Sequence, residues 1–462
     1  MIMKFVPFAV LAVPAFVAAH GNDHARLYAR QATSSAPAAT GTPPATVSFS
    51  LPTTNPTAVP LASITSGTPV LPPLSVTTTY AAGAQPTFLS NAPPLPDLSK
   101  VLPANYPALD KVPPTDSPQV QQWIQDVANS GITIPNITAT VAGGCPANPQ
   151  AAADTSRCWW TCGGCTRDDD ITTCPDKLHW GLTHDDGPSP FTPNLLAYLQ
   201  QANLHTTFFV VGSRAISYPT LLVEEYMAQH QLGVHTWSHP DLTTLTNEQI
   251  IAEFGWTKKV IKDITGVTPT HFRPPFGDVD DRVRAIAKAM NLETVIWTRI
   301  SPTATFDTGD FNVAGGTTSP SQVLANWEQI MGNATTISTG FIVLEHDLFQ
   351  QTVELATGYI LPAALANNPA LTIQPVITCL HKDFGDAYIE TNNNSTNPLP
   401  VTASGSGSSG SSQSASGTNS GSGAQATGGS GKSSAARVSV DNLLSGVVTG
   451  GVAIVAGLSA LL

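Results

Sequence analysis

The sequence is short of positive charge: 20 of its 462 residues are Lys or Arg, against 32 Asp and Glu, so its formal net charge is −12. It contains no run of Lys and Arg. Proteins that bind nucleic acid gather basic residues on one face or along one helix, where they neutralise phosphates. The composition therefore argues against a nucleic-acid partner.

A long apolar run is also missing near the N-terminus. The apolar stretch of residues 5–17 follows a single charge at Lys4 and precedes the small residues Ala18 and Ala19. It is too short and wrongly flanked to span a membrane, and this arrangement is typical of a cleaved secretory signal. We therefore predict a signal peptide over residues 1–19.

The C-terminal part lacks periodicity until its last residues. Residues 401–434 consist almost entirely of Ser, Gly, Ala, Thr and Gln, which predicts a flexible stalk. Small residues, a short spacer and the apolar run of residues 443–462 follow, which is the signal for a glycosylphosphatidylinositol (GPI) anchor. We expect attachment at Ser433 or Ser434 and removal of residues 435–462. A tail-anchored transmembrane helix is the alternative.

Cysteine is scarce, but its six residues form an even number, which suits disulfides in an oxidising compartment. N-glycosylation sequons fit the same compartment, and they begin at Asn136, Asn333, Asn393 and Asn394. With the two termini, these features predict a secreted protein that is GPI-anchored to the plasma membrane or transferred from it to the cell wall.

Composition divides the rest of the chain into segments. Residues 20–117 are rich in Pro, Thr, Ser and Ala and lack periodicity, which predicts a disordered arm. The start of this arm, to about residue 30, could be a pro-segment. Residues 118–174 form a Cys-rich extension that opens with apolar residues at helical spacing. A folded domain is expected over residues 175–385 and the stalk over residues 386–434.

Strand-like and helix-like stretches alternate within the expected folded domain. This order predicts an α/β fold of parallel strands with helices outside, and its many repeats favour a barrel. Functional residues of such folds lie at the carboxyl ends of the strands. The expected strands cover residues 178–183, 206–211, 232–234, 294–297 and 341–344, and the expected helices cover residues 193–202, 221–229, 247–264, 281–290, 321–331 and 353–365.

Acidic and histidine motifs follow two of these strands. Asp185 and Asp186 precede a Gly-Pro turn that could bring both carboxylates to one pocket, although a helix cap or solvated turn is the alternative. His235 and His239 follow another strand, and Thr236 replaces the Glu of the helical zinc-protease motif, which favours a loop. Two histidines and a carboxylate form a metal site with positions open for water and substrate.

These segments resemble the NodB-homology polysaccharide deacetylases of carbohydrate esterase family 4, and especially the fungal chitin deacetylases. Five short motifs occur in the order of that family. The resemblance implies a distorted (β/α) barrel with Asp185 as general base, and with Asp186, His235 and His239 as ligands of one divalent metal ion. Zinc fits these ligands best, and cobalt is the alternative.

The other three motifs carry further roles through the same resemblance. Arg273, in the run Arg-Pro-Pro-Phe-Gly, would orient the general base, and its guanidinium would hold that carboxylate ionised. His346 would be the general acid, and a carboxylate of the fourth motif would hold its protonated form. We favour Asp310 over Asp307 for that carboxylate, in a motif where Phe311 replaces the Trp of the family.

Substrate contacts are expected from Trp237, Phe276 and Leu344, which could shape an acetyl pocket or a sugar platform. Core packing is the alternative for each of them, and we expect it for Phe311. His184 stands where the family usually has Phe or Tyr. For this residue, packing is favoured over a role as a third histidine ligand.

Four cysteines between residues 145 and 165 have the local spacing of a zinc finger, but a secreted protein favours disulfides. Cys174 and Cys379 flank the expected catalytic region, and we expect them to pair and tie its two ends. The other four would staple a Trp-containing loop, with a connectivity that the sequence leaves open.

The resemblance therefore implies a monomeric chitin deacetylase, an amide hydrolase that releases acetate from N-acetylglucosamine units of chitin and leaves chitosan. Its expected partners are chitin or chito-oligosaccharides and other cell-wall glycans. Two alternatives stay open: a deacetylase of another acetylated glycan or short sugar, and a non-catalytic protein that binds wall glycans with the same fold.

Overall fold

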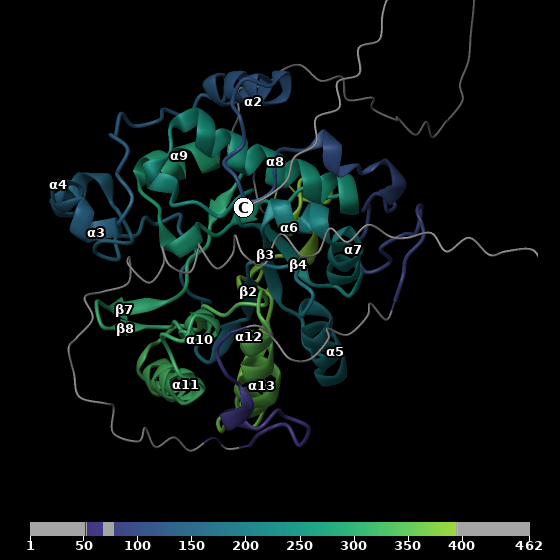
Figure 1. Ribbon diagram of the computed structural model, residues 1–462, viewed down its shortest axis with the longest axis vertical. Helices are drawn as coiled ribbons and strands as arrows, with labels where there is room; N and C mark the ends of the chain where they lie inside the picture. Colours follow the sequence, from purple (N-terminus) through teal and green to yellow (C-terminus); the bar gives the residue numbers. More distant parts are fainter. Residues whose placement is uncertain (1–50, 52, 68–77, 394, 396–462) are drawn as a thin grey trace, which may run out of the picture. The chain divides into compact units, whose positions relative to one another are not determined.

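The computed structural model describes residues 51, 53–67, 78–393 and 395, which all belong to one unit of the chain, residues 1–405 (Figure 1). The second unit, residues 406–462, lies outside the described residues. The expected signal peptide, the GPI-attachment residues Ser433 and Ser434, and Asn394 also lie outside them. These expectations stay predictions.

Parallel strands form the centre of the described structure. Five pair in chain order into one sheet, and in a second sheet β1 lies between β10 and β9. A parallel bridge between Asp185 and His346 links the first sheet to the chain that follows β9. This arrangement confirms the predicted α/β fold of the distorted-barrel type. The strands are β1 (His179–Gly181), β2 (Thr183–Asp185), β3 (Thr207–Val210), β4 (Gln231–Val234), β5 (His271–Phe272), β6 (Glu293–Thr294), β9 (Phe341–Ile342) and β10 (Thr372–Gln374), with a separate antiparallel pair of β7 (Arg299–Ser301) and β8 (Ala304–Thr305).

Helices pack around these strands, and their ends follow ordinary capping chemistry. The 19-residue helix α8 begins after Thr246, which forms a capping box with Gln249, and stops at Gly266, whose φ is 87°. It contacts α6, α7 and α9. The α-helices are α2 (Pro118–Ala128), α3 (Gly144–Ala147), α4 (Pro149–Ala153), α5 (Thr192–Ala202), α6 (Gly212–Ser217), α7 (Pro219–Met227), α8 (Asn247–Thr265), α9 (Asp281–Ala289), α10 (Phe311–Ala314), α11 (Pro320–Thr336), α12 (Gln350–Leu355), α13 (Leu361–Leu365) and α14 (Val376–Cys379).

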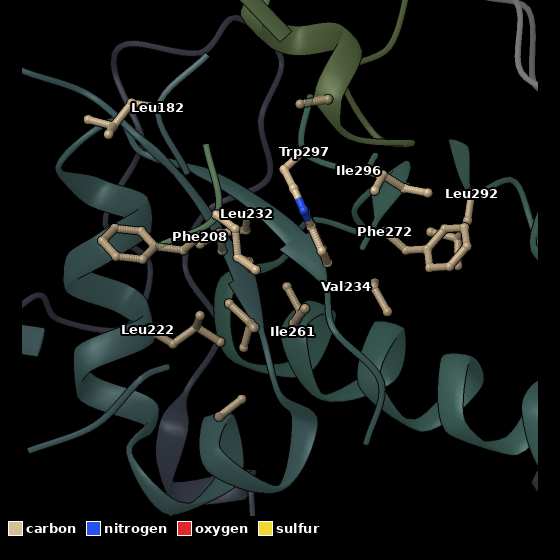
Figure 2. Packing of buried hydrophobic residues seen from close by; sticks show 14 of the residues in the cluster. Leu182, Phe208, Leu222, Leu232, Val234, Ile261, Phe272, Leu292, Ile296 and Trp297 are labelled. Carbon is tan, nitrogen blue, oxygen red and sulfur yellow. The ribbon is translucent and has the colours of Figure 1, made fainter. Parts of the chain in front are cut away.

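One apolar cluster holds the central strands against the helices. Figure 2 shows Phe208 of β3 and Leu232 and Val234 of β4 together with Leu222 of α7 and Ile261 of α8. Each of these side chains is at most 1% exposed. Burying one side chain of this size contributes about 1.5–3 kcal/mol, so the cluster fixes the strands whose ends carry the candidate site.

The expected disordered arm belongs to the folded unit wherever it is described. In residues 53–67 and 78–117, Ile64, Leu95 and Val101 are 3%, 4% and 9% exposed and pack on the main core. The prediction of disorder is therefore wrong for these residues. An irregular, proline-rich backbone has no hydrophobic period, but single apolar side chains still anchor it.

The folded unit also extends beyond residue 385, where the stalk was expected to begin. Ala387 and Tyr388 are fully buried, and the Tyr388 hydroxyl accepts a hydrogen bond from the Leu232 amide at 3.0 Å. The Asn393 amide donates to Asp386 Oδ1 at 2.8 Å. The expected boundary is therefore wrong, because this segment closes over the end of β4.

All six cysteines are paired, as Cys145–Cys162, Cys158–Cys165 and Cys174–Cys379. The third disulfide joins residues 205 apart in the sequence and ties together the two ends of the barrel. The first two disulfides crosslink the segment that precedes the barrel, residues 138–165, which is named the stapled extension below. In the part of the chain that the structure describes, no helix has both the length and the apolar character needed to cross a bilayer.

Candidate active site

The expected site residues follow the carboxyl ends of neighbouring parallel strands. Asp185 ends β2, His235 comes directly after β4, and Arg273 comes directly after β5. His346 is brought beside Asp185 by their parallel bridge. Because the strands run in one direction, their ends gather side chains that are far apart in the sequence.

Asp186, His235 and His239 form a cluster whose ligand atoms all lie within 4.8 Å of one another. Asp186 Oδ1 lies 3.4 Å from His235 Nε2 and 3.1 Å from His239 Nε2, and it is buried without a hydrogen bond. His235 Nδ1 lies 2.7 Å from the Arg273 carbonyl oxygen and donates to it, which leaves the Nε2 lone pair directed at the cluster. A divalent cation would satisfy these groups, so the residues fit the metal ion that the resemblance implies.

Glu253 of α8 holds the loop that carries the two histidines. Its Oε2 accepts hydrogen bonds from the amides of Trp237 and Ser238 at 2.7 and 2.9 Å, and its Oε1 accepts one from the Ser238 hydroxyl at 2.5 Å. Burial raises the pKa of Glu253 to about 7 although these hydrogen bonds lower it. Thr236 and His239 have φ values of 66° and 58°, so the segment is a tight turn and not a helix.

Arg214 of α6 supports Asp186 from the backbone side. Its Nη1 donates to the Asp186 carbonyl oxygen at 2.7 Å and lies 3.6 Å from Asp186 Oδ1. Asp186 has a φ of 80°, a conformation that a residue other than glycine keeps only when its surroundings hold it. Neither Arg214 nor Glu253 was predicted from the sequence, because each acts from a helix that carries no recognisable motif.

Arg273 and Asp185 form a buried ion pair. Arg273 Nη1 lies 2.8 Å from Asp185 Oδ1 and also donates to the Thr183 hydroxyl at 2.8 Å. The guanidinium lies over the Phe209 ring, 4.4 Å from its centre. Asp185 Oδ2 lies 4.0 Å from His235 Nε2, so this carboxylate faces the cluster from one side. The arrangement holds an anionic oxygen next to the metal-ligand atoms.

His346 is paired with Asp310. Its Nδ1 lies 2.7 Å from Asp310 Oδ1, and its amide donates to Asp310 Oδ2 at 2.9 Å. Asp307 instead accepts a hydrogen bond from the Gly309 amide at 2.8 Å. Burial lowers the pKa of His346, but the charge and hydrogen bond of Asp310, with smaller contributions from other acidic residues nearby, raise it to about 10. His346 is therefore a cation at neutral pH.

A pocket of about 60 Å³ lies between Asp185, His235, His239 and His346. The Phe276 ring lies 4.7 Å from the His239 ring, and the Phe311 ring lies 5.0 Å from the His346 ring. The pocket is larger than one water molecule, which occupies about 30 Å³, and far smaller than a sugar site. Trp297 and Asn312 in the wall of this pocket were not predicted from the sequence. The lining residues are Asp185, His235, His239, Pro274, Phe276, Trp297, Asp307, Gly309, Phe311, Asn312, Leu344 and His346.

Trp237 does not line this pocket, so its expected role in substrate binding is wrong. Its side chain is fully buried, stacks on the Tyr106 ring at 6.0 Å and donates through its indole nitrogen to the Ala108 carbonyl at 3.1 Å. Phe311, which was expected to pack in the core, lines the pocket and also packs against Phe349. The sequence motifs do not reveal which side of the loop each ring faces.

His184 lies outside the three-residue cluster. It is fully buried, its Nδ1 lies 3.0 Å from the Thr206 hydroxyl, and its ring packs on Phe208. Burial lowers the pKa of His184 to about 3, so its side chain is neutral.

Two of the sequon residues, Asn136 and Asn393, are exposed, and Asn333 is half-buried.

Comparison with known proteins identifies the family. Residues 172–295 match the family model described as polysaccharide deacetylase. The chain is 53% identical over 340 residues to chitin deacetylase 1 of Cryptococcus neoformans var. grubii, an alignment that covers 73% of this chain and 71% of that relative. The chain belongs to the polysaccharide deacetylase family.

Other members of the polysaccharide deacetylase family are also similar. The chitin deacetylase of Amylomyces rouxii is 40% identical over 208 residues, which are 43% of this chain and 47% of that relative. The solved chitin deacetylase of Colletotrichum lindemuthianum is 25% identical, covers 48% of this chain and 95% of its own, and has a TM-score of 0.42. The matched family region contains the metal-ligand cluster, whereas His346, Asp310 and the stapled extension lie outside it.

Proposed function

We propose that this polysaccharide deacetylase removes the N-acetyl groups of N-acetylglucosamine units in chitin, giving chitosan and acetate. The observation that carries the proposal is the small pocket that His235 and His239 of the metal-ligand cluster line together with Asp185 and His346. Its volume of about 60 Å³ suits an acetyl group and a water molecule better than a whole sugar. Chitin as the substrate is supported by the similar proteins of Cryptococcus neoformans and Amylomyces rouxii, which are named as chitin deacetylases.

The cluster is proposed to hold one divalent cation, with zinc as the best fit to one carboxylate and two imidazoles. When bound, such an ion would polarise the acetamide carbonyl and increase the acidity of a water molecule. Glu253 and Arg214 keep the three ligand atoms in position through their hydrogen bonds to the histidine loop and to Asp186.

Asp185 is proposed as the general base. Its Oδ1 is fixed by Arg273, while its Oδ2 lies toward His235 and is available to take a proton from the attacking water. Water then adds to the carbonyl carbon of the acetamide, and the C–N bond breaks.

His346 is proposed as the general acid. Because its Nδ1 is engaged by Asp310, the Nε2–H is the proton that remains for the leaving nitrogen of the sugar. Its pKa of about 10 keeps it protonated until the amine departs. Asp185 takes one proton from water and His346 gives one to the leaving nitrogen, so water and amide become acetic acid, which ionises to acetate, and an amine.

The proposed location is outside the cell, with a GPI lipid at the plasma membrane or later transfer to the wall. It rests on the residue patterns of the two termini and is supported by the three disulfides.

Acetate release from chitin and chito-oligosaccharides tests the proposal. The protein is assayed as purified, after treatment with a chelator, and after addition of zinc or cobalt. We expect release to stop after chelation and to return with the metal. If the metal-loaded protein releases acetate from no acetylated glycan, the proposal that it is an enzyme is refuted. If it releases acetate only from another glycan, such as acetylxylan, that glycan replaces chitin as the proposed substrate.

A further inference from the structure

A second hollow of about 200 Å³ adjoins the reaction pocket. Its wall shares five residues with that pocket, namely Phe276, Trp297, Asp307, Asn312 and Leu344. The second hollow is about three times as large as the reaction pocket. The two hollows therefore lie side by side, with the smaller one at the reactive groups and the larger one beside it.

The far wall of the larger hollow comes from the stapled extension, residues 138–165, which precedes the region that matches the family model. The extension contributes Thr140, Val141, Trp159 and Thr161 to the hollow. Helices α3 and α4 belong to this extension (Figure 1). The Val141 side chain is 60% exposed, which is unusual for a large apolar residue.

Buried polar contacts lock the extension to the loop after the Arg-Pro-Pro-Phe-Gly motif. Asp278 accepts hydrogen bonds from the Trp159 indole nitrogen at 2.6 Å and from the Thr161 hydroxyl at 3.2 Å. Arg157 pairs with Asp280 at 2.7 Å, with side chains only 5% and 0% exposed. Arg157, Asp278 and Asp280 are buried, which strengthens these polar contacts and holds the extension beside the loop that follows Phe276.

Aromatic packing couples the same wall to the reaction pocket. The Trp160 ring lies 4.6 Å from the Trp297 ring, and Gly277, with a φ of 65°, lets Trp160 approach the backbone. A Cβ at Gly277 would lie 2.3 Å from the Trp160 ring, so this contact requires glycine. Two disulfides, Cys145–Cys162 and Cys158–Cys165, then limit how far the extension can move away.

The lining chemistry suits a neutral sugar. It combines aromatic and aliphatic surface with threonine hydroxyls, one amide and carboxylates, and no Lys, Arg or His is among its residues. Pyranose rings offer apolar C–H faces and a rim of hydroxyls, which such a mixture can bind through packing and hydrogen bonds. An anionic glycan would face the carboxylates of Asp241 and Asp307.

We propose that the stapled extension forms one wall of a sugar subsite beside the reaction pocket, where it binds the neighbouring N-acetylglucosamine unit of the substrate chain. This inference rests on the proposed function for the identity of the sugar. The extension thereby makes the enzyme favour polymeric substrates over small acetylated compounds.

Val141→Arg tests the subsite, because an exposed side chain can be replaced without disturbing the core. Its matched control is Leu365→Arg, which changes another exposed apolar residue, 49% exposed, outside both hollows. The assay compares kcat/KM for chitopentaose with kcat/KM for 4-nitrophenyl acetate, which needs only the reaction pocket. We expect Val141→Arg to lower the chitopentaose value by about tenfold or more and to leave the ester value within about twofold. Leu365→Arg should change neither value.

If Val141→Arg lowers kcat/KM equally for both substrates, or does not lower kcat/KM for chitopentaose, the proposed subsite is overturned. Binding of chitopentaose, measured by calorimetry, separates this inference from the proposed function. If the wild-type protein binds chitopentaose but releases no acetate, weaker binding by Val141→Arg still supports the subsite, while the catalytic proposal fails. If Val141→Arg binds chitopentaose as tightly as the wild type, the subsite is refuted whatever the activity.

Discussion

Replacing Asp310 with Asn removes the charge that keeps His346 protonated while changing little of the shape around it. Asp310 Oδ1 lies 2.7 Å from His346 Nδ1, and Oδ2 accepts from the His346 amide at 2.9 Å. An Asn side chain can accept from the His346 amide through its oxygen and donate through its NH2 group to Nδ1 of a neutral imidazole, so it favours the neutral form of His346. Once the carboxylate is gone, burial becomes the main influence on the imidazole, and burial lowers its pKa.

The expected size of the effect follows from two pKa values. The wild-type pKa of His346 is about 10. Without Asp310 we expect a pKa at or below the ordinary value of about 6.5. A group with a raised pKa is fully protonated below it and loses its proton as pH rises through it. At pH 9 the protonated fraction would then fall from about nine-tenths to about 0.3%, or roughly 300-fold, whereas at pH 7 the loss is about fourfold.

The assay is the pH dependence of kcat/KM for acetate release from chitopentaose. The basic limb should move from near pH 10 to below pH 7 in Asp310→Asn. Asp307→Asn is the matched control, because Asp307 belongs to the same motif but accepts from Gly309 and acts on His346 only through its charge, so its basic limb should move much less. An unmoved limb in Asp310→Asn, or an equal shift in Asp307→Asn, would refute the role assigned to Asp310.

Three further outcomes are expected. Glu253→Ala should weaken zinc binding by about 10- to 100-fold, because the histidine loop loses its hydrogen bonds, whereas Glu253→Gln should weaken it less. Competition with a chromogenic chelator measures the zinc affinity of both variants. A zinc affinity of Glu253→Ala equal to that of the wild type would contradict the account. Replacing Cys174 and Cys379 with Ser should lower the free energy of unfolding by about 5 kcal/mol in urea, since their disulfide closes a loop of 205 residues, and a loss below about 1 kcal/mol would show that it is dispensable. Trp237→Phe should lower the melting temperature but leave KM for chitopentaose unchanged, and a raised KM would restore Trp237 to the substrate site.

Elements with a clear period were predictable from the sequence. The helix expected over residues 247–264 is α8, Asn247–Thr265, and the strand expected over residues 206–211 contains β3, Thr207–Val210. The strand β5, His271–Phe272, was missed because two residues are too few to show an alternation. The packed part of the arm was missed for a related reason, since it is held by scattered apolar side chains.

The site was predictable where motifs follow strands and unpredictable where distant residues support them. Asp186, His235 and His239 could be found because each lies in a short motif after a strand. Glu253 and Arg214 could not be found, because they reach backbone groups of those motifs from separate helices. Pairing of distant residues depends on the closed fold, which local sequence does not encode.

Asp185→Asn, measured for metal content and turnover on the same preparation, tests the central claim most directly. Asp186, His235 and His239 are unchanged in this variant, so it should bind one equivalent of zinc as the wild type does. Loss of the general base should lower acetate release from chitopentaose by about 10²- to 10⁴-fold. Loss of the metal, or turnover close to that of the wild type, would contradict the assignment of the base to Asp185 and of the metal to its neighbour Asp186.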